Sequence, residues 1–330
     1  AAYWAFMLTD GALRMLVLLH FHTLGFSPVQ LAYLFVLYEI AGVITNLSAG
    51  WIAARFGLTS TLYAGLSLQV VALLALTQLD PAWSITASVV FVMLVQGLSG
   101  VAKDLAKMSS KILAPATGGG LFRWVAILTG SKNAVKGSGF LLGAVLLAVF
   151  GFVPSVLTMA AILFVILIGV VIGMPTGLPV GRKDAKFSEV FSKNRNINWL
   201  SAARLFLFGA RDVWFVVGIP IYFYAVLSDG SAQGNRAAFF MIGTFMAVWT
   251  ILYGFIQGWA PRILKAPSRT EAEILALAKR WVGLLITVPT FLAGLVWLVP
   301  EPSNALTTTI VLGLLVFGGI FAVNSSLHSY

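Results

Sequence analysis

The chain has 330 residues, of which 59% are hydrophobic and only 10% are charged, and its formal net charge is +10. A water-soluble domain could not bury so large an apolar fraction, and continuously apolar runs such as 159–174 exclude the alternating pattern of a membrane β-barrel. Helices remain as the spanning elements, so the mean hydropathy of +0.96 predicts an all-α, polytopic membrane protein.

Apolar segments separated by turn residues or by charge predict about ten membrane spans. We place them at 1–22, 30–54, 60–79, 83–107, 121–150, 152–174, 197–226, 237–260, 279–299 and 305–328. The first residue is not Met and already belongs to an apolar segment, so we expect a native N-terminal stretch to precede it. No signal peptide is readable.

The longest polar stretch, PTGLPVGRKDAKFSEVFSKNRNIN, follows the sixth span and holds five basic residues against two acidic ones. It predicts a linker, 175–196, between an N-terminal six-helix bundle, 1–174, and a C-terminal helical bundle, 197–330. Alternate loops on the same side are also basic, whereas Arg236 is the only Lys or Arg in the opposite loops. The positive-inside rule therefore places the N-terminus and the linker in the cytoplasm, with the chain in the inner (cytoplasmic) membrane. Orientation explains most of the net charge, so we expect no nucleic-acid partner.

This layout of six spans, a basic linker and further spans resembles the major facilitator superfamily, whose members have twelve helices in two halves with substrate between them. The stretch GWIAARFG resembles the superfamily's loop signature, Gly-x-x-x-Asp-Arg-x-Gly-Arg, at Gly50, Arg55 and Gly57. It departs from the signature with Ala54 in place of the acid and Leu58 in place of the last base. The resemblance implies a two-bundle transporter of which about ten of twelve helices are present, with the C-terminal bundle truncated.

Ionisable residues in the first two spans are candidate functional residues, because a charge at the bilayer centre costs roughly 2.5–3.5 kcal/mol unless it is paired or wetted. Asp10 and Arg14 lie four residues apart and share a helix face, so they either neutralise each other or serve a substrate or proton. Glu39 has no base nearby in sequence. We expect it to carry a coupling proton or to form an ion pair with Lys132 or Lys136.

The fourth and fifth spans carry lysines. Lys103 and Lys107 share a stripe near the cytoplasmic mouth with Asp104 alongside, where they could steer anions or simply reach water. In the fifth span Lys132, Asn133 and Lys136 form one polar face, and their helix contains no acid. The two lysines repel each other at this spacing, so negative charge must come from another helix or from a substrate.

In the seventh span Arg204 and Arg211 are seven residues apart and line one stripe. The planar fork of arginine matches phosphate-like and carboxylate oxygens, which favours Arg211, the deeper of the two, for substrate and leaves Arg204 as a possible anchor. Asp212 is adjacent and could hold Arg211 in place, pair with a lysine of the first bundle, or carry a proton.

Together these candidates contain more bases than acids. The bases are Arg14, Lys103, Lys107, Lys132, Lys136, Arg204 and Arg211, and the acids are Asp10, Glu39, Asp104 and Asp212. An excess of positive charge in a membrane interior predicts a small, multiply anionic, oxygen-rich substrate rather than a cation or a neutral sugar.

The same stretches, LTDGALRMLVLLHFH, YEIAGVITNLSAGWIAARFG, GLSGVAKDLAKMSSK, FRWVAILTGSKNAVKG and LSAARLFLFGARDVWFVVG, resemble the ArsJ family of organoarsenical efflux permeases. The resemblance implies export of 1-arseno-3-phosphoglycerate, which a glyceraldehyde-3-phosphate dehydrogenase makes when it uses arsenate in place of phosphate, and thus arsenate resistance. The two anionic ends of this ester could engage Lys132 with Lys136 and Arg211 with Arg14. An organophosphate or phosphate exchanger of the same fold is the alternative.

Two other classes fit the sequence less well. A membrane enzyme acting on lipid phosphates would need a general base or a metal near the interface. The chain has three His, no Cys and no acidic pair in an outer loop, so we expect neither catalysis nor a metal or cofactor. A sensor that uses the same anion site without transport would be separated only by a flux assay.

Overall fold

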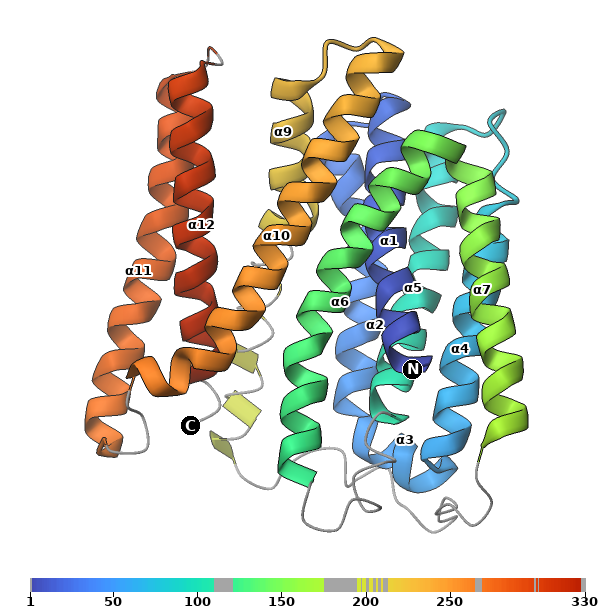
Figure 1. The fold of residues 1–330 in the computed structure, drawn as a ribbon, viewed down its shortest axis with the longest axis horizontal. Coiled ribbons are helices and arrows are strands. Elements are labelled where there is room, and N and C mark those ends of the chain that lie inside the picture. The colour runs from blue at the N-terminus through green and yellow to red at the C-terminus, as the bar shows by residue number, and fades with distance from the viewer. Residues whose placement is uncertain are drawn as a thin grey trace.

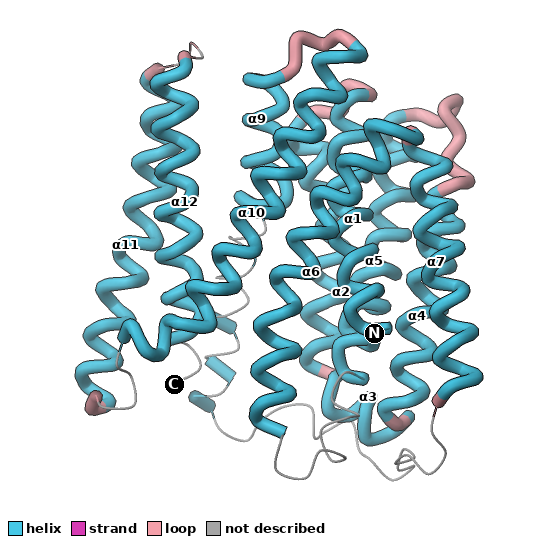
Figure 2. The backbone as a smooth tube through the Cα atoms, viewed as in Figure 1, coloured by secondary structure: helices cyan, strands magenta, loops and turns pink. Residues whose placement is uncertain are grey.

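The computed structural model describes residues 2–109, 121–174, 213–264, 269–299 and 303–327, together with 195, 196, 198, 199, 202, 203, 206, 209 and 301. All regular elements among these residues are helices (Figures 1 and 2). Nine of the described helices are long and apolar enough to cross a membrane. The predicted class, an all-α polytopic membrane protein, is confirmed.

Seven helices form the first bundle. They are α1 (Ala2–Thr23), α2 (Pro28–Leu47), α3 (Ala49–Phe56), α4 (Leu58–Leu76), α5 (Ile85–Ser109), α6 (Leu121–Phe150) and α7 (Phe152–Gly173). Helix α6 packs against α1, and α5 packs against both α2 and α4. Helix α1 is the most enclosed, with almost all side chains buried from Phe6 to Phe21.

The described helices that follow are a six-residue π-helix, η4 (Val213–Gly218), and α9 (Ile219–Leu227), α10 (Ala232–Leu264), α11 (Glu271–Leu298) and α12 (Asn304–Leu327), which we call the second bundle. Helix α12 packs against both α10 and α11. The long helix α10 also packs along α6, and this contact joins the two bundles (Figure 1). A smaller contact joins η4 to α1 and α2.

Several predicted spans have different boundaries in the structure, and the eighth, expected over 237–260, extends to Ala232–Leu264 as α10. The second, expected as one segment over 30–54, breaks at Ser48 into α2 and α3. The ninth begins at Glu271 rather than at 279, because Thr270 and Glu273 form a capping box that starts the helix before its apolar part. The seventh predicted span, 197–226, is only partly described, as η4 and α9, and most of the predicted linker lies outside the described residues.

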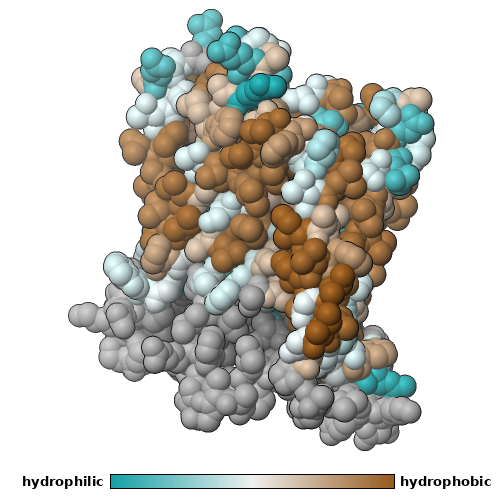
Figure 3. Space-filling view, turned by 45° about the vertical axis from the view of Figure 1, so that its right-hand side comes forward, coloured by the Kyte–Doolittle hydropathy of each residue, from teal (hydrophilic) through white to brown (hydrophobic). Residues whose placement is uncertain are grey.

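The surface matches a membrane-spanning protein. Figure 3 shows hydrophobic side chains in a band across the middle of the molecule and hydrophilic ones toward its upper end. We call the end where α1 begins and Arg55 lies the basic end; loops at the opposite end carry Asp80, Asp229 and Glu301. There the hydroxyl and backbone N–H of Ser231 donate to Asp229 and lower the pKa of its carboxyl.

Glycines bring the polar face of α6 close to its neighbours. A Cβ added at Gly11 would lie 2.6 Å from the carbonyl oxygen of Lys136, and one at Gly139 would meet the carbonyl of Leu8. On the other side of α6, a Cβ at Gly254 of α10 would lie 2.9 Å from that of Asn133. Larger residues would separate these helices, so the glycines set how closely α1 and α10 flank the lysines of α6.

Candidate functional site

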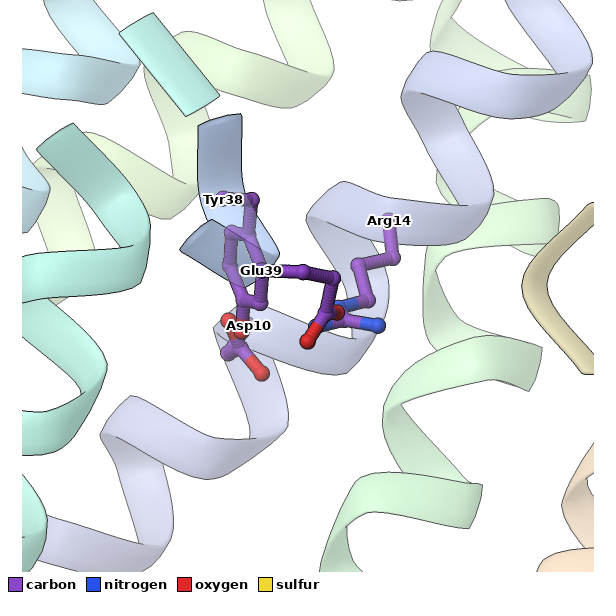
Figure 4. A network of polar contacts seen from close by, with 4 residues as sticks. All are labelled: Asp10, Arg14, Tyr38 and Glu39. Carbon is purple, nitrogen blue, oxygen red and sulfur yellow. Dashed lines mark hydrogen bonds and ion pairs between the residues drawn. The ribbon is translucent and has the colours of Figure 1, made fainter. Parts of the chain in front are cut away.

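A buried ion pair links the first two helices. Arg14 of α1 donates from Nη2 to Oε1 of Glu39 on α2 at 2.8 Å (Figure 4). The two side chains differ in exposure, because that of Arg14 is 2% exposed and that of Glu39 is 37% exposed. Glu39 therefore pairs with Arg14, and the predicted pairing with Lys132 or Lys136 is wrong.

Tyr38 lies at the centre of this cluster and is fully buried. Its hydroxyl donates to Oδ1 of Asp10 at 2.6 Å, so Asp10 bonds to a neighbouring helix although Arg14 is only one turn away on its own (Figure 4). The Arg14 guanidinium carbon lies 4.0 Å from the ring centroid of Tyr38, and Nζ of Lys103 lies 4.2 Å from it. Both distances allow cation–π attraction, so the ring stabilises two cations. They come from different helices, α1 and α5, and residue spacing in the sequence does not predict that they meet.

A second group of charges extends from this cluster toward the basic end. Lys107 of α5 donates to Oδ1 of Asn46 at 2.9 Å and lies 3.6 Å from Oδ1 of Asp104. The side chain of Lys107 is 45% exposed, whereas that of Asp104 is 1% exposed. Within the described part of the chain neither carboxylate oxygen of Asp104 accepts a hydrogen bond, so ionic contact with lysine is what compensates its charge.

The polar face of α6 divides between two neighbours. Lys132 and Lys136 are both half-buried, and the backbone of Lys136 packs on Gly11, next to Asp10 in α1. Asn133 instead turns to the second bundle, where its Nδ2 donates to Oε1 of Gln257 at 3.0 Å. The structure thus places the two lysines near the Arg14 helix and gives Asn133 a partner across the bundle interface.

Sequence reasoning missed the continuation of this hydrogen-bonded chain. Gln257 donates to Oγ of Ser325 on α12 at 3.1 Å, and the Tyr253 hydroxyl lies 3.2 Å from the same oxygen. Tyr253 and Gln257 are four residues apart in an apolar stretch of α10, and that spacing was the available signal. Tyr38 was missed because an aromatic residue in a membrane helix usually indicates packing alone.

The candidate residues therefore fall into three sets. Asp10, Arg14, Glu39 and Lys103 meet around Tyr38, and Asp104 with Lys107 lies beside them. Lys132 and Lys136 lie on the helix packed against α1. The predicted residues Arg204, Arg211 and Asp212 lie outside the described residues. Among the described residues no group of three or more His, Asp or Glu side chains is arranged to hold a metal ion.

An uncharged groove lies elsewhere on α1 and α6. It has a volume of about 380 Å³ and is lined by Trp4, Ala5, Leu8, Ala134, Val135 and Ser138. The charged candidates do not line it, and Ser138 is an exposed residue. The groove is therefore separate from the charged cluster.

Solved structures of known transporters share this arrangement. A D-xylose–proton symporter matches with a TM-score of 0.58 and 12% identity over 98% of this chain and 79% of that one. The xylose transporter XylE from E. coli, in a partially occluded inward-open conformation, matches with a TM-score of 0.56 and 13% identity over 99% of this chain and 84% of that one. A bacterial homologue of the iron transporter ferroportin, in the outward-facing state, matches with a TM-score of 0.54 and 15% identity over 99% of this chain and 82% of that one.

The chain has the fold of a major facilitator transporter. No protein-family model matches it, and no curated protein sequence matches it significantly. Identities of this size show the fold alone, and a fold does not determine a substrate. The matched structures include an inward-open and an outward-facing state.

Proposed function

We propose that this protein carries a small, multiply anionic, oxygen-rich substrate across the membrane by alternating access of its two bundles. The observation that carries the proposal is Arg14, a guanidinium only 2% exposed, which lies with Lys103 against one tyrosine ring inside a membrane helix bundle. Such charge is costly in a bilayer and typically marks a substrate or ion pathway. Among the described candidates, bases also outnumber acids.

We assign the substrate as 1-arseno-3-phosphoglycerate, because the charged helices resemble those of the ArsJ efflux permeases. The ester has an arsenate group at one end and a phosphate at the other, and both suit basic side chains. In this assignment one end binds Lys132 and Lys136, and the other binds Arg14 and Arg211. A glyceraldehyde-3-phosphate dehydrogenase supplies the ester, so the pair together gives arsenate resistance.

The direction of transport follows from the charge of the substrate. A membrane potential that is negative inside drives anions outward, at roughly 2.3 kcal/mol per charge and per 100 mV. A multiply charged ester gains a multiple of this energy by leaving the cell. Proton coupling through Glu39 or Asp212 would add to this driving force, but export does not depend on it.

Uptake into everted membrane vesicles tests the proposal. The ester is generated in place from arsenate, glyceraldehyde 3-phosphate and NAD+ by the dehydrogenase, which passes the hydride of the aldehyde to NAD+. Arsenic accumulation is compared for the unaltered chain, Lys132→Gln and Arg211→Gln. Arg236→Gln is the matched control for loss of one positive charge, because Arg236 lies near the N-terminus of α10, at the end of the molecule opposite the basic end. We expect accumulation that needs the dehydrogenase reaction and both interior bases but not Arg236.

Other outcomes separate the alternatives. Accumulation from arsenate without the dehydrogenase would indicate an inorganic anion carrier, and exchange of phosphate for an organophosphate would indicate the exchanger. Correctly inserted protein that moves none of these anions would contradict transport. A sensor that binds the anion without transporting it would then be the remaining alternative.

The orientation is part of the same proposal, with the N-terminus and the linker 175–196 in the cytoplasm of a cell whose inner membrane holds the protein. The chain contains no Cys, so single cysteines can be labelled without a background. A membrane-impermeant maleimide applied to intact cells should label Ala82→Cys, in the exposed loop between α4 and α5, and should not label Lys183→Cys in the linker. The reverse pattern would invert the topology.

A further inference from the structure

The Arg14–Glu39 pair is asymmetric in a way that suggests exchange. We propose, on the basis of the anion-transport function above, that Glu39 is a displaceable internal counter-anion. Its carboxylate pairs with the guanidinium of Arg14 when no substrate is bound and separates from it when an anionic group of the substrate binds there instead. The substrate class of this position is thus a tetrahedral oxyanion, such as a phosphate or arsenate group.

Arg14 is the fixed member of the pair. Its side chain is 2% exposed, its guanidinium lies 4.0 Å from the Tyr38 ring, and α1 is enclosed along most of its length. A buried guanidinium without a counter-charge is strongly unfavourable, so a state without substrate needs a carboxylate at this position. Glu39 meets that need at 2.8 Å.

Glu39 is the member that can leave. Its side chain is 37% exposed, so water can solvate the carboxylate after it separates from Arg14. An oxyanion presents several oxygens to a planar fork that suits them, so it competes well with a single carboxylate contact. Exchange of one anion for another leaves Arg14 neutralised throughout, which keeps the cost of releasing Glu39 low.

The other carboxylates nearby are poor candidates for this role. Asp10 is 1% exposed and accepts the Tyr38 hydroxyl, and Asp104 is 1% exposed with Lys107 at 3.6 Å. Neither could separate from its partner into water without further rearrangement. The described elements packed against α2 carry these charged residues: Asp10 and Arg14 on α1, Lys103, Asp104 and Lys107 on α5, Arg55 on α3, and none on η4.

Polar side chains continue from Glu39 along α2 toward the basic end. Asn46 follows Glu39 by seven residues on nearly the same stripe, roughly 10 Å nearer the basic end, and Lys107 donates to it. The side chain of Lys107 is 45% exposed. An oxyanion arriving from the basic end would therefore meet Lys107 before it reaches Glu39 and Arg14.

Sulfate binding to the purified, full chain tests the exchange. Sulfate is a tetrahedral dianion, so it presents the oxyanion chemistry proposed for this position. Removing the competing carboxylate in Glu39→Gln should tighten sulfate binding about tenfold, the equivalent of one charge-assisted hydrogen bond. Sulfate should also raise the melting temperature of Glu39→Gln more than that of the unaltered chain, because the anion then takes the place of the missing carboxylate.

Two further variants separate exchange at Arg14 from a general change of charge. Asp104→Asn, the matched removal of one nearby carboxylate, should tighten sulfate binding much less than Glu39→Gln does. The double variant Arg14→Gln with Glu39→Gln should lose the gain in affinity, because it has neither the competitor nor the site.

The outcomes are distinct. If Glu39→Gln binds sulfate no more tightly than the unaltered chain, the exchange is overturned while the anion-transport function stands. If neither form binds sulfate, phosphate or the ester, the exchange fails together with the proposed function.

Discussion

Two polar regions of this protein differ in their charge and in the helices that they connect. The cluster of Asp10, Arg14, Tyr38 and Glu39 is charged and lies within the first bundle, on α1 and α2. The chain of Asn133, Gln257 and Ser325 is uncharged and crosses from α6 of the first bundle to α10 and α12 of the second. Costly charges are thus paired inside one bundle, and neutral groups connect the two.

The difference fits the alternating access proposed for this protein. In such a cycle contacts between bundles break and re-form, and a neutral hydrogen bond contributes only about 0.5–1.5 kcal/mol. An ion pair whose arginine is buried is a poor moving contact, because breaking it without a replacement anion leaves that charge uncompensated. Charge is better exchanged than broken, which is the role proposed for Glu39.

The largest effect should follow from Arg14→Gln. Truncating one partner of a hydrogen-bonded charge pair costs about 2–5 kcal/mol, so anion binding should weaken at least about 30-fold. Thermal stability should change little, because the Glu39 left behind is 37% exposed and can be hydrated. Isothermal titration with sulfate and a thermal unfolding curve measure the two effects.

Arg14→Lys is the control for this change, since it keeps the charge and loses only the planar fork. We expect it to bind sulfate with an affinity between those of the unaltered chain and Arg14→Gln. Equal affinity in all three proteins would show that the charged cluster does not bind the anion.

An intermediate effect should come from Tyr38→Phe. The variant loses the 2.6 Å bond to Asp10 and leaves that buried carboxylate without this donor, so we expect about 1–3 kcal/mol of lost stability. The ring remains beside Arg14 and Lys103, so sulfate affinity should stay nearly constant. Tyr38→Leu also removes the ring and should weaken sulfate binding further, by about 0.5–2 kcal/mol. If Tyr38→Phe weakened binding as much as Tyr38→Leu, the hydroxyl rather than the ring would hold the cations.

Hydropathy and charge predicted much of this molecule. The helical class and most span limits follow from apolar length, which a bilayer imposes directly. Sequence also selected Asp10, Arg14, Glu39 and Lys103 as special, because ionisable residues are rare in membrane helices. These signals depend on one residue or one helix at a time.

Partners could not be predicted in the same way. Spacing along α1 suggested Asp10 for Arg14, yet the arginine reaches Glu39, 25 residues away. The choice depends on how α1, α2 and α5 approach one another, and glycines such as Gly100 allow the backbone of Tyr38 to come into contact with α5. Helix approach is a property of the packed bundle, so local sequence patterns contain little information about it.

The smallest effect should be found where the bundles meet. A double-mutant cycle of Asn133→Ala and Gln257→Ala isolates their 3.0 Å hydrogen bond, and comparable bonds in membrane proteins contribute about 0.6 kcal/mol and at most about 1.7. Ser99→Ala with Gln257→Ala is the control, because Ser99 donates to Gln69 within the first bundle and should be additive with a distant change. Unfolding in bilayers measures each corner of the cycle. A coupling energy as large as that of a charge pair would mean that the interface is locked by its polar contacts, and the separation of costly charge from moving contacts would then be lost.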